Sequence, residues 1–118
     1  MKVKRYADAA AYVAPNHFDM RSLRLQGFEP GGPEAFWVGL SHFLPGGGAG
    51  PDSSPLEKVY VMLAGSLTVQ VGDTTTVLGP MDSCCIPGGE TRAVKNVGNE
   101  VATMLVVMPY PPAAKPAG

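Results

Sequence analysis

The side chains best suited to chemistry lie in two short segments in the middle of the chain. Residues 46–65 read GGGAGPDSSPLEKVYVMLAG and carry Asp52, Ser54 and Lys58. Residues 81–96 read MDSCCIPGGETRAVKN and carry Arg92. At neutral pH lysine and arginine offer only N–H donors, and a guanidinium can hold a carboxylate through two parallel hydrogen bonds. These residue types favour an anionic ligand over a metal cation.

Three of these residues are candidate catalytic groups. Lys58 can act as a general acid or base if burial and Arg92 lower its pKa, and a Schiff base with a carbonyl substrate is a weaker option. Arg92 can orient an anionic group or stabilise a developing oxyanion. Asp52 can position Lys58 or serve as the base. The alternative is purely structural: Lys58 and Arg92 pair with Asp52 or Glu57 and fill an inactive interior with ion pairs.

The alternation of side chains along a strand extends this site. In a strand over 56–63, Tyr60 and Met62 lie on the same face as Lys58. They would form an apolar wall beside the cations, as in most small-ligand sites. Ser54 and His42 complete the candidate ligand-binding set. We favour a structural interpretation for both of these residues and for Asp52. Asp52 and Ser54 lie in a Gly/Pro/Ser loop where both residue types are common in turns, and His42 reads as a hydrogen-bonded histidine on a half-buried strand.

Short strands must position these residues. Apolar runs bounded by glycine and proline predict about eight strands, at 20–26, 36–44, 56–63, 66–72, 74–78, 83–87, 91–96 and 101–109. Gly72-Asp73 reads as a hairpin turn, and 27–35 and 45–55 read as loops. The fold class is therefore all-β, a barrel or jelly roll. We divide the chain into an N-terminal arm with the first strand (1–26), the barrel (27–109) and a mobile Pro-rich tail (110–118).

The stretch from 36 to 109 resembles the small single-domain cupins, an RmlC-like family. The first cupin motif, G-x5-H-x-H-x3,4-E-x6-G, fits Gly46 to Gly65, and the second, G-x5-P-x-G-x2-H-x3-N, fits 81–96. Pro87, Gly89 and Asn96 match the second motif. The ligand positions of the motifs are occupied by other residue types: Asp52, Ser54, Lys58 and Arg92.

The resemblance implies a cupin-type jelly-roll barrel, commonly a homodimer, with its site in one barrel mouth. Metal-binding members hold a divalent cation with histidines and a glutamate. Here those positions carry two cations and one carboxylate, so we expect no metal and no cofactor. Cupin activities include dioxygenases, decarboxylases, isomerases, epimerases and cyclases, as well as pure binding proteins, so the fold alone does not select a reaction.

Composition excludes several function classes. Nine basic and ten acidic residues give a net charge of −1, without a basic patch for nucleic acid or membranes. The N-terminus lacks a signal-peptide pattern, and no run is long enough to span a membrane. The only cysteines, Cys84 and Cys85, point to opposite strand faces, which suits barrel-wall packing and a reducing compartment. We expect a cytoplasmic location, and we expect His17, in a loop beside Asn16, on the surface.

Three functions remain open. We favour a metal-independent cupin that binds or transforms a small anionic, carboxylate-like molecule. The second is a metal-dependent enzyme of oxygenase, isomerase or decarboxylase type, with a displaced site built from Asp52, Glu57, His42 or a cysteine. The third is a non-catalytic dimeric module that binds a ligand. Whether the protein is an enzyme is left open between them.

Overall fold

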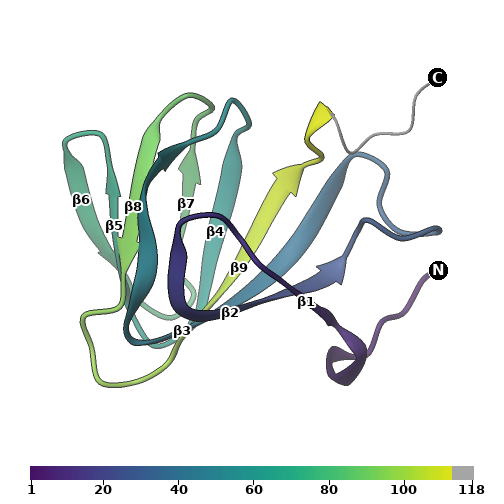
Figure 1. Cartoon of the computed structure of the whole chain (residues 1–118), viewed down its shortest axis with the longest axis horizontal. Helices are drawn as coiled ribbons and strands as arrows, with labels where there is room; N and C mark the ends of the chain where they lie inside the picture. Colours follow the sequence, from purple (N-terminus) through teal and green to yellow (C-terminus); the bar gives the residue numbers. More distant parts are fainter. Residues whose placement is uncertain (113–118) are drawn as a thin grey trace.

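The structure, a computed structural model, describes residues 1–112. These residues form a short 3-10 turn, η1, at Tyr6–Asp8 and nine strands, which confirms the all-β prediction (Figure 1). The strands are β1 Ala10–Tyr12, β2 His17–Gln26, β3 Phe36–Ser53, β4 Lys58–Ala64, β5 Leu67–Val71, β6 Thr74–Leu78, β7 Ser83–Ile86, β8 Thr91–Lys95 and β9 Ala102–Pro109.

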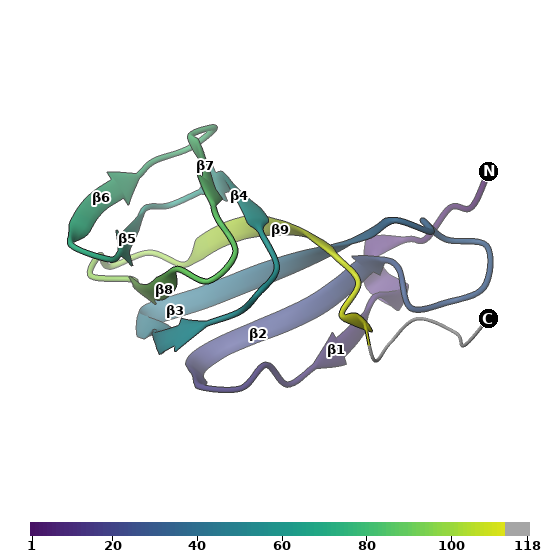
Figure 2. The ribbon, with the colours of Figure 1, turned by 90° about the horizontal axis from the view of Figure 1, so that it is seen from above.

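The strands form one curled antiparallel sheet. Its order is β6-β5-β8-β3-β9-β4-β7, with β2 also paired to β3 and β1 paired to β2. Figure 2, seen from above, shows the sheet curving round on itself, with β6 and β7 at one side and β1 and β2 at the other. The 18-residue β3 joins the two halves because its first part pairs with β9 and its last part with β8.

The predicted loop at 45–55 is wrong over most of its length. β3 continues through Ser53 and pairs with β8, so the glycines of this run belong to a strand. A Cβ atom on Gly48 would lie 2.2 Å from the carbonyl oxygen of Val94. Glycine is required here because two backbones approach closely, and the resulting composition imitates a loop.

The other predicted strands agree with the structure to within a few residues. The two-residue turn at Gly72-Asp73 is confirmed, since Val71 pairs with Thr74 across it. The three-residue β1 was not predicted, because it is too short to show alternation. Both β1 and β2 pair within the chain, so residues 10–26 form one flank of the sheet.

The core fills the space enclosed by the sheet. Its largest fully buried side chains are Phe43, Met62, Leu67, Ile86, Met104, Val69 and Asn96. The half-buried Cys84 packs against this core while Cys85 is exposed, as alternation predicts, and both thiols are free. Of the segment predicted as a mobile tail, residues 113–118 lie outside the described part of the chain. Its first residue, Tyr110, donates a hydrogen bond to the Pro33 carbonyl at 2.6 Å.

Within residues 1–112, the structure contains no helix of the length and apolarity needed to cross a membrane.

Candidate functional site

A cavity of about 340 Å³ opens at one mouth of the barrel. It is bordered by side chains from six strands (β1, β2, β3, β4, β8 and β9) and by the loop between β1 and β2. These strands begin or end near the mouth, so residues far apart in sequence are brought together there. The site is therefore a product of the fold, not of one local motif.

The three predicted catalytic residues line this cavity together. Asp52 lies near the end of β3 and is paired in register with Arg92 on β8. Lys58 opens β4, and Tyr60, two residues later on the same face, also lines the cavity. Lys58 and Arg92 are each only 6% exposed, whereas Asp52 is exposed. The cavity thus contains two buried cations beside one solvent-facing carboxylate.

The two buried cations are not neutralised within the described part of the chain. The ion pairs among residues 1–112 join Lys2 and Lys4 to Glu29, and none of these three residues borders the cavity. Arg92 donates one hydrogen bond, from Nη1 to the Gly50 carbonyl at 3.3 Å, and its buried Nε has no partner. The ion pairs that the structural alternative requires, from Asp52 or Glu57 to these cations, do not occur among the described residues. Unpaired buried charge is costly, which makes the arrangement a candidate for function.

The cavity shifts the titration of its own side chains. Burial lowers the pKa of Lys58 below its ordinary value, the charge of Arg92 lowers it further, and Asp52 acts in the opposite direction. Burial raises the pKa of Tyr60 to about 12, with the charge of Arg92 partly offsetting the rise. At neutral pH Tyr60 is a neutral hydroxyl donor, and Lys58 gives up its proton more readily than an exposed lysine.

His17 is a correction, because it lies on the cavity wall and not on the open surface. Its Nδ1 lies 2.7 Å from the Pro15 carbonyl oxygen, which can only accept a hydrogen bond. Nδ1 therefore carries the hydrogen, and in the neutral ring Nε2 is a free acceptor. Burial is the main cause that lowers the pKa of His17, so the neutral form is favoured. The signal that was missed is Asn16, whose positive φ of 61° marks the turn before β2.

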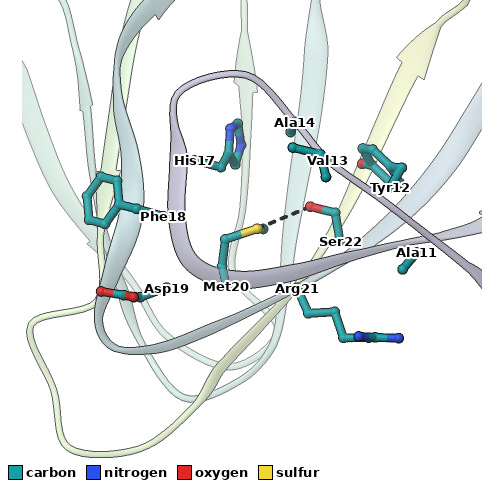
Figure 3. A pocket seen from close by; sticks show the side chains of 10 residues that line it. All are labelled: Ala11, Tyr12, Val13, Ala14, His17, Phe18, Asp19, Met20, Arg21 and Ser22. Carbon is teal, nitrogen blue, oxygen red and sulfur yellow. Dashed lines mark hydrogen bonds between the residues drawn. The ribbon is translucent and has the colours of Figure 1, made fainter.

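The loop of residues 13–16 forms part of the cavity wall and is tethered at its end. Asn16 accepts a hydrogen bond from Gly50 N at 2.9 Å and donates from Nδ2 to the Pro51 carbonyl at 3.2 Å. A second hollow of about 300 Å³ lies beside this loop. Figure 3 shows the side chains that line it and the loop arching around His17. The two hollows share Tyr12, Val13, Ala14 and His17, so the loop is a thin partition between them.

Three residues of the predicted ligand set do not line the cavity. Met62 is fully buried in the core beneath it. Ser54 Oγ accepts a hydrogen bond from Leu56 N at 3.1 Å, a local turn interaction. His42 lies 3.0 Å from Thr103 Oγ1 and 2.9 Å from the Tyr6 hydroxyl, which places it on the other face of β3. For Ser54 and His42 the structural interpretation accounts for the observed contacts.

The donor atoms do not fit a transition metal of the kind that the cupin resemblance implies. Among histidine, cysteine, aspartate and glutamate, only His17 and Asp52 border the cavity in the described residues. No group of three or more such residues able to hold an ion occurs within 1–112. A tightly held divalent transition metal commonly takes at least three protein ligands. The displaced site considered above would need donors, such as Glu57 and His42, that lie outside this cavity.

Comparison with known proteins identifies the family and several relatives. Residues 39–108 match the family described as Cupin domain. The chain is 45% identical over 111 residues to β-D-galactosidase Rv1717 of Mycobacterium tuberculosis (strain ATCC 25618 / H37Rv), covering 94% of this chain and 96% of that protein.

Solved structures support the same fold. The polyketide cyclase RemF from Streptomyces resistomycificus superposes with a TM-score of 0.82 at 25% identity, over 92% of this chain and 79% of that chain. An RmlC-like cupin from Shewanella frigidimarina NCIMB 400 gives a TM-score of 0.77 at 12% identity, over 95% and 93% of the two chains, and so supports the fold alone. The jelly-roll prediction is confirmed, and the chain belongs to the cupin domain family.

Proposed function

We propose that the cavity binds a small molecule bearing a carboxylate and that the chain transforms this molecule by proton transfer, without a transition metal. The observation that carries the proposal is the pair Lys58 and Arg92. Both are buried, both line one cavity, and neither has a carboxylate partner within the described residues. An anionic group entering the cavity would supply the missing charge and the missing hydrogen-bond acceptors.

In this proposal each residue that lines the cavity has a separate role. Arg92 holds the carboxylate, because a guanidinium keeps its charge when buried and binds in a fork. Neutral His17 offers Nε2 as a general base, and Tyr60 offers a hydroxyl that stays protonated. Lys58 supports the bound anion when charged and accepts a proton when neutral. Asp52, which faces solvent, favours the charged forms of Lys58 and His17.

Two measurements test this proposal. Protein produced in metal-replete medium and purified without chelator should contain no stoichiometric iron, nickel, manganese or zinc by mass spectrometry. A thermal-shift screen of small carboxylates should find stabilising compounds, and Arg92→Gln should abolish their effect. Arg21→Gln is the matched control, because Arg21 is exposed on β2 and outside the cavity. One equivalent of metal, or undiminished binding by Arg92→Gln, would contradict the proposal.

A second candidate is hydrolysis of a β-galactoside, favoured by the 45% identity to the relative named β-D-galactosidase. Most glycosidases use two carboxyl groups. Here Asp52 is the only carboxyl group among the described residues that border the cavity, so Tyr60 or Lys58 would have to supply the proton. Release of nitrophenol from o-nitrophenyl β-D-galactoside, lost in Asp52→Asn, would support this candidate. If the wild-type protein does not hydrolyse that substrate, the β-galactosidase candidate is wrong.

We also propose that the protein works as a cytoplasmic homodimer. Strands β6 and β7 end the sheet path, and unpaired strand edges are commonly covered in native proteins. Light scattering coupled to size-exclusion chromatography would measure the mass, and a monomer would contradict this. A protein that binds carboxylates but turns none over would instead be the non-catalytic ligand-binding module.

A further inference from the structure

A third cation lines the same cavity at a distance in sequence from the cupin motifs. Arg24, on β2, has its guanidinium carbon 4.1 Å from the centre of the Phe28 ring and 4.9 Å from the centre of the Tyr12 ring. Phe28 and Tyr12 in turn pack on Trp37, with ring centres 5.5 and 5.9 Å apart. All four residues border the cavity.

This aromatic group holds Arg24 without neutralising it. The buried Nε of Arg24 and the indole Nε1 of Trp37 have no hydrogen-bond partner within the described residues. The ion pairs found among residues 1–112 do not include Arg24. Cation–π contacts orient a guanidinium and leave its N–H edge available, because the rings contact its face.

The close packing around Trp37 shows that this group is built into the barrel. A Cβ atom on Gly39 would lie 2.7 Å from the Trp37 ring and 3.0 Å from the Tyr12 hydroxyl oxygen, so both rings occupy space that glycine leaves free. Gly39 is also the register partner of Arg24 across the β2–β3 ladder. The position of the guanidinium is therefore fixed by backbone pairing as well as by its aromatic neighbours.

We propose that Arg24 is a second anion anchor, so that the natural ligand is a dianion, most simply a dicarboxylate. One carboxylate binds at Lys58 and Arg92 and the other at Arg24, with the Trp37 indole N–H as an additional donor. This inference rests on the proposed function and specifies its ligand. Among the described charged residues that border the cavity, three are cationic and only Asp52 is acidic, so a monoanion would leave an excess of positive charge.

Calorimetric titration of the full chain with matched acids tests the inference. The probes are the linear dicarboxylates from succinate to suberate, each compared with the monocarboxylate of equal chain length. We expect at least one dicarboxylate to bind about tenfold or more tightly than its monocarboxylate, a typical difference for one charge-assisted contact. Arg24→Met keeps an apolar stem between the rings and should remove this preference, because it weakens dicarboxylate binding much more than monocarboxylate binding. Arg24→Lys should keep part of it.

The outcomes separate this inference from the proposed function. If every dicarboxylate binds no better than its monocarboxylate, or if Arg24→Met weakens both equally while its melting temperature is unchanged, the second anchor is wrong. Arg92→Gln should weaken both classes of acid. If Arg92→Gln weakens binding of neither class, or if the wild-type chain binds neither class, the proposed function is wrong. The second anchor, which rests on that function, is then wrong as well.

Discussion

Two residues on or just beyond β8 show how differently the two ends of the barrel treat buried polar groups. Asn96 is 1% exposed, and its side chain is saturated: Nδ2 donates to the carbonyls of Phe43 at 3.0 Å and Glu100 at 2.7 Å, and Oδ1 accepts from Gly98 N at 3.0 Å. Arg92, four residues earlier, is 6% exposed and leaves its buried Nε unpartnered. The closed end uses polar atoms for stability, and the open mouth keeps them available.

The largest effect is expected at the closed end. Asn96→Leu removes three side-chain hydrogen bonds and leaves buried partners unsatisfied, so it should lower the free energy of unfolding by about 3 kcal/mol or more. Chemical denaturation measures this change. Asn99→Leu, at an exposed position nearby, is the matched control. If Asn96→Leu lowers the free energy of unfolding no more than Asn99→Leu does, then polar groups at the closed end do not stabilise the fold as we infer.

The complementary change at the mouth should affect binding and not folding. Arg92→Gln should weaken carboxylate binding by about a hundredfold, because a buried charged contact is worth about 3 kcal/mol. The free energy of unfolding should stay constant or rise, since an unpaired buried charge is removed. Titration calorimetry and denaturation on the same samples report both quantities. A stability loss as large as that of Asn96→Leu would make Arg92 a structural residue.

Lys58→Met should stabilise the protein by about 1 kcal/mol at neutral pH, because it removes a charge that burial disfavours. The pH dependence gives an independent check. The pKa of Lys58 is lower in the folded chain than its ordinary value. Between these two pKa values the folded chain therefore binds fewer protons than the unfolded chain. The destabilisation caused by burying charged Lys58 should therefore shrink as pH rises through this interval and return in full as pH falls below it. The variant should lack that slope.

The smallest expected effect is a proton taken up with the ligand. Burial and Arg92 lower the pKa of Lys58, and an anion bound beside it should raise that pKa again. At a pH below the ordinary pKa of lysine, ligand binding should therefore be accompanied by uptake of a fraction of a proton on Lys58. Affinity should accordingly fall as pH rises through the pKa of Lys58 in the empty cavity. Calorimetry in buffers of different ionisation enthalpy measures the uptake. A ligand affinity independent of pH, with no proton exchanged, would show that Lys58 stays charged throughout.

Much of the fold and part of the site could be predicted from sequence. Strand alternation and the spacing of glycine and proline gave the strands, and the cupin motifs placed Asp52, Lys58 and Arg92 close enough in the fold to border one cavity. His17 and Arg24 were missed because they come from β2, which neither motif includes. Their positions depend on a turn at Asn16 and on long-range register with β3, which local patterns do not encode.

Two members of the candidate ligand set, Met62 and His42, lie outside the cavity for related reasons. Alternation gives the face of a strand but not the depth along it. Met62 shares its face with Lys58 and Tyr60 yet lies one step deeper, in the closed core. For His42 the strand face itself is opposite, because Ser41 and Phe43 take the inward positions that border the cavity.

The tether at Asn16 has a consequence for how such barrels diversify. Because two hydrogen bonds join the loop end to Gly50 and Pro51, the rim keeps its outline when side chains below it change. Insertions or deletions in residues 13–15 would then alter which molecules pass through the entrance while the charges beneath stay as they are. Ligand size and ligand charge could in this way change independently in related proteins.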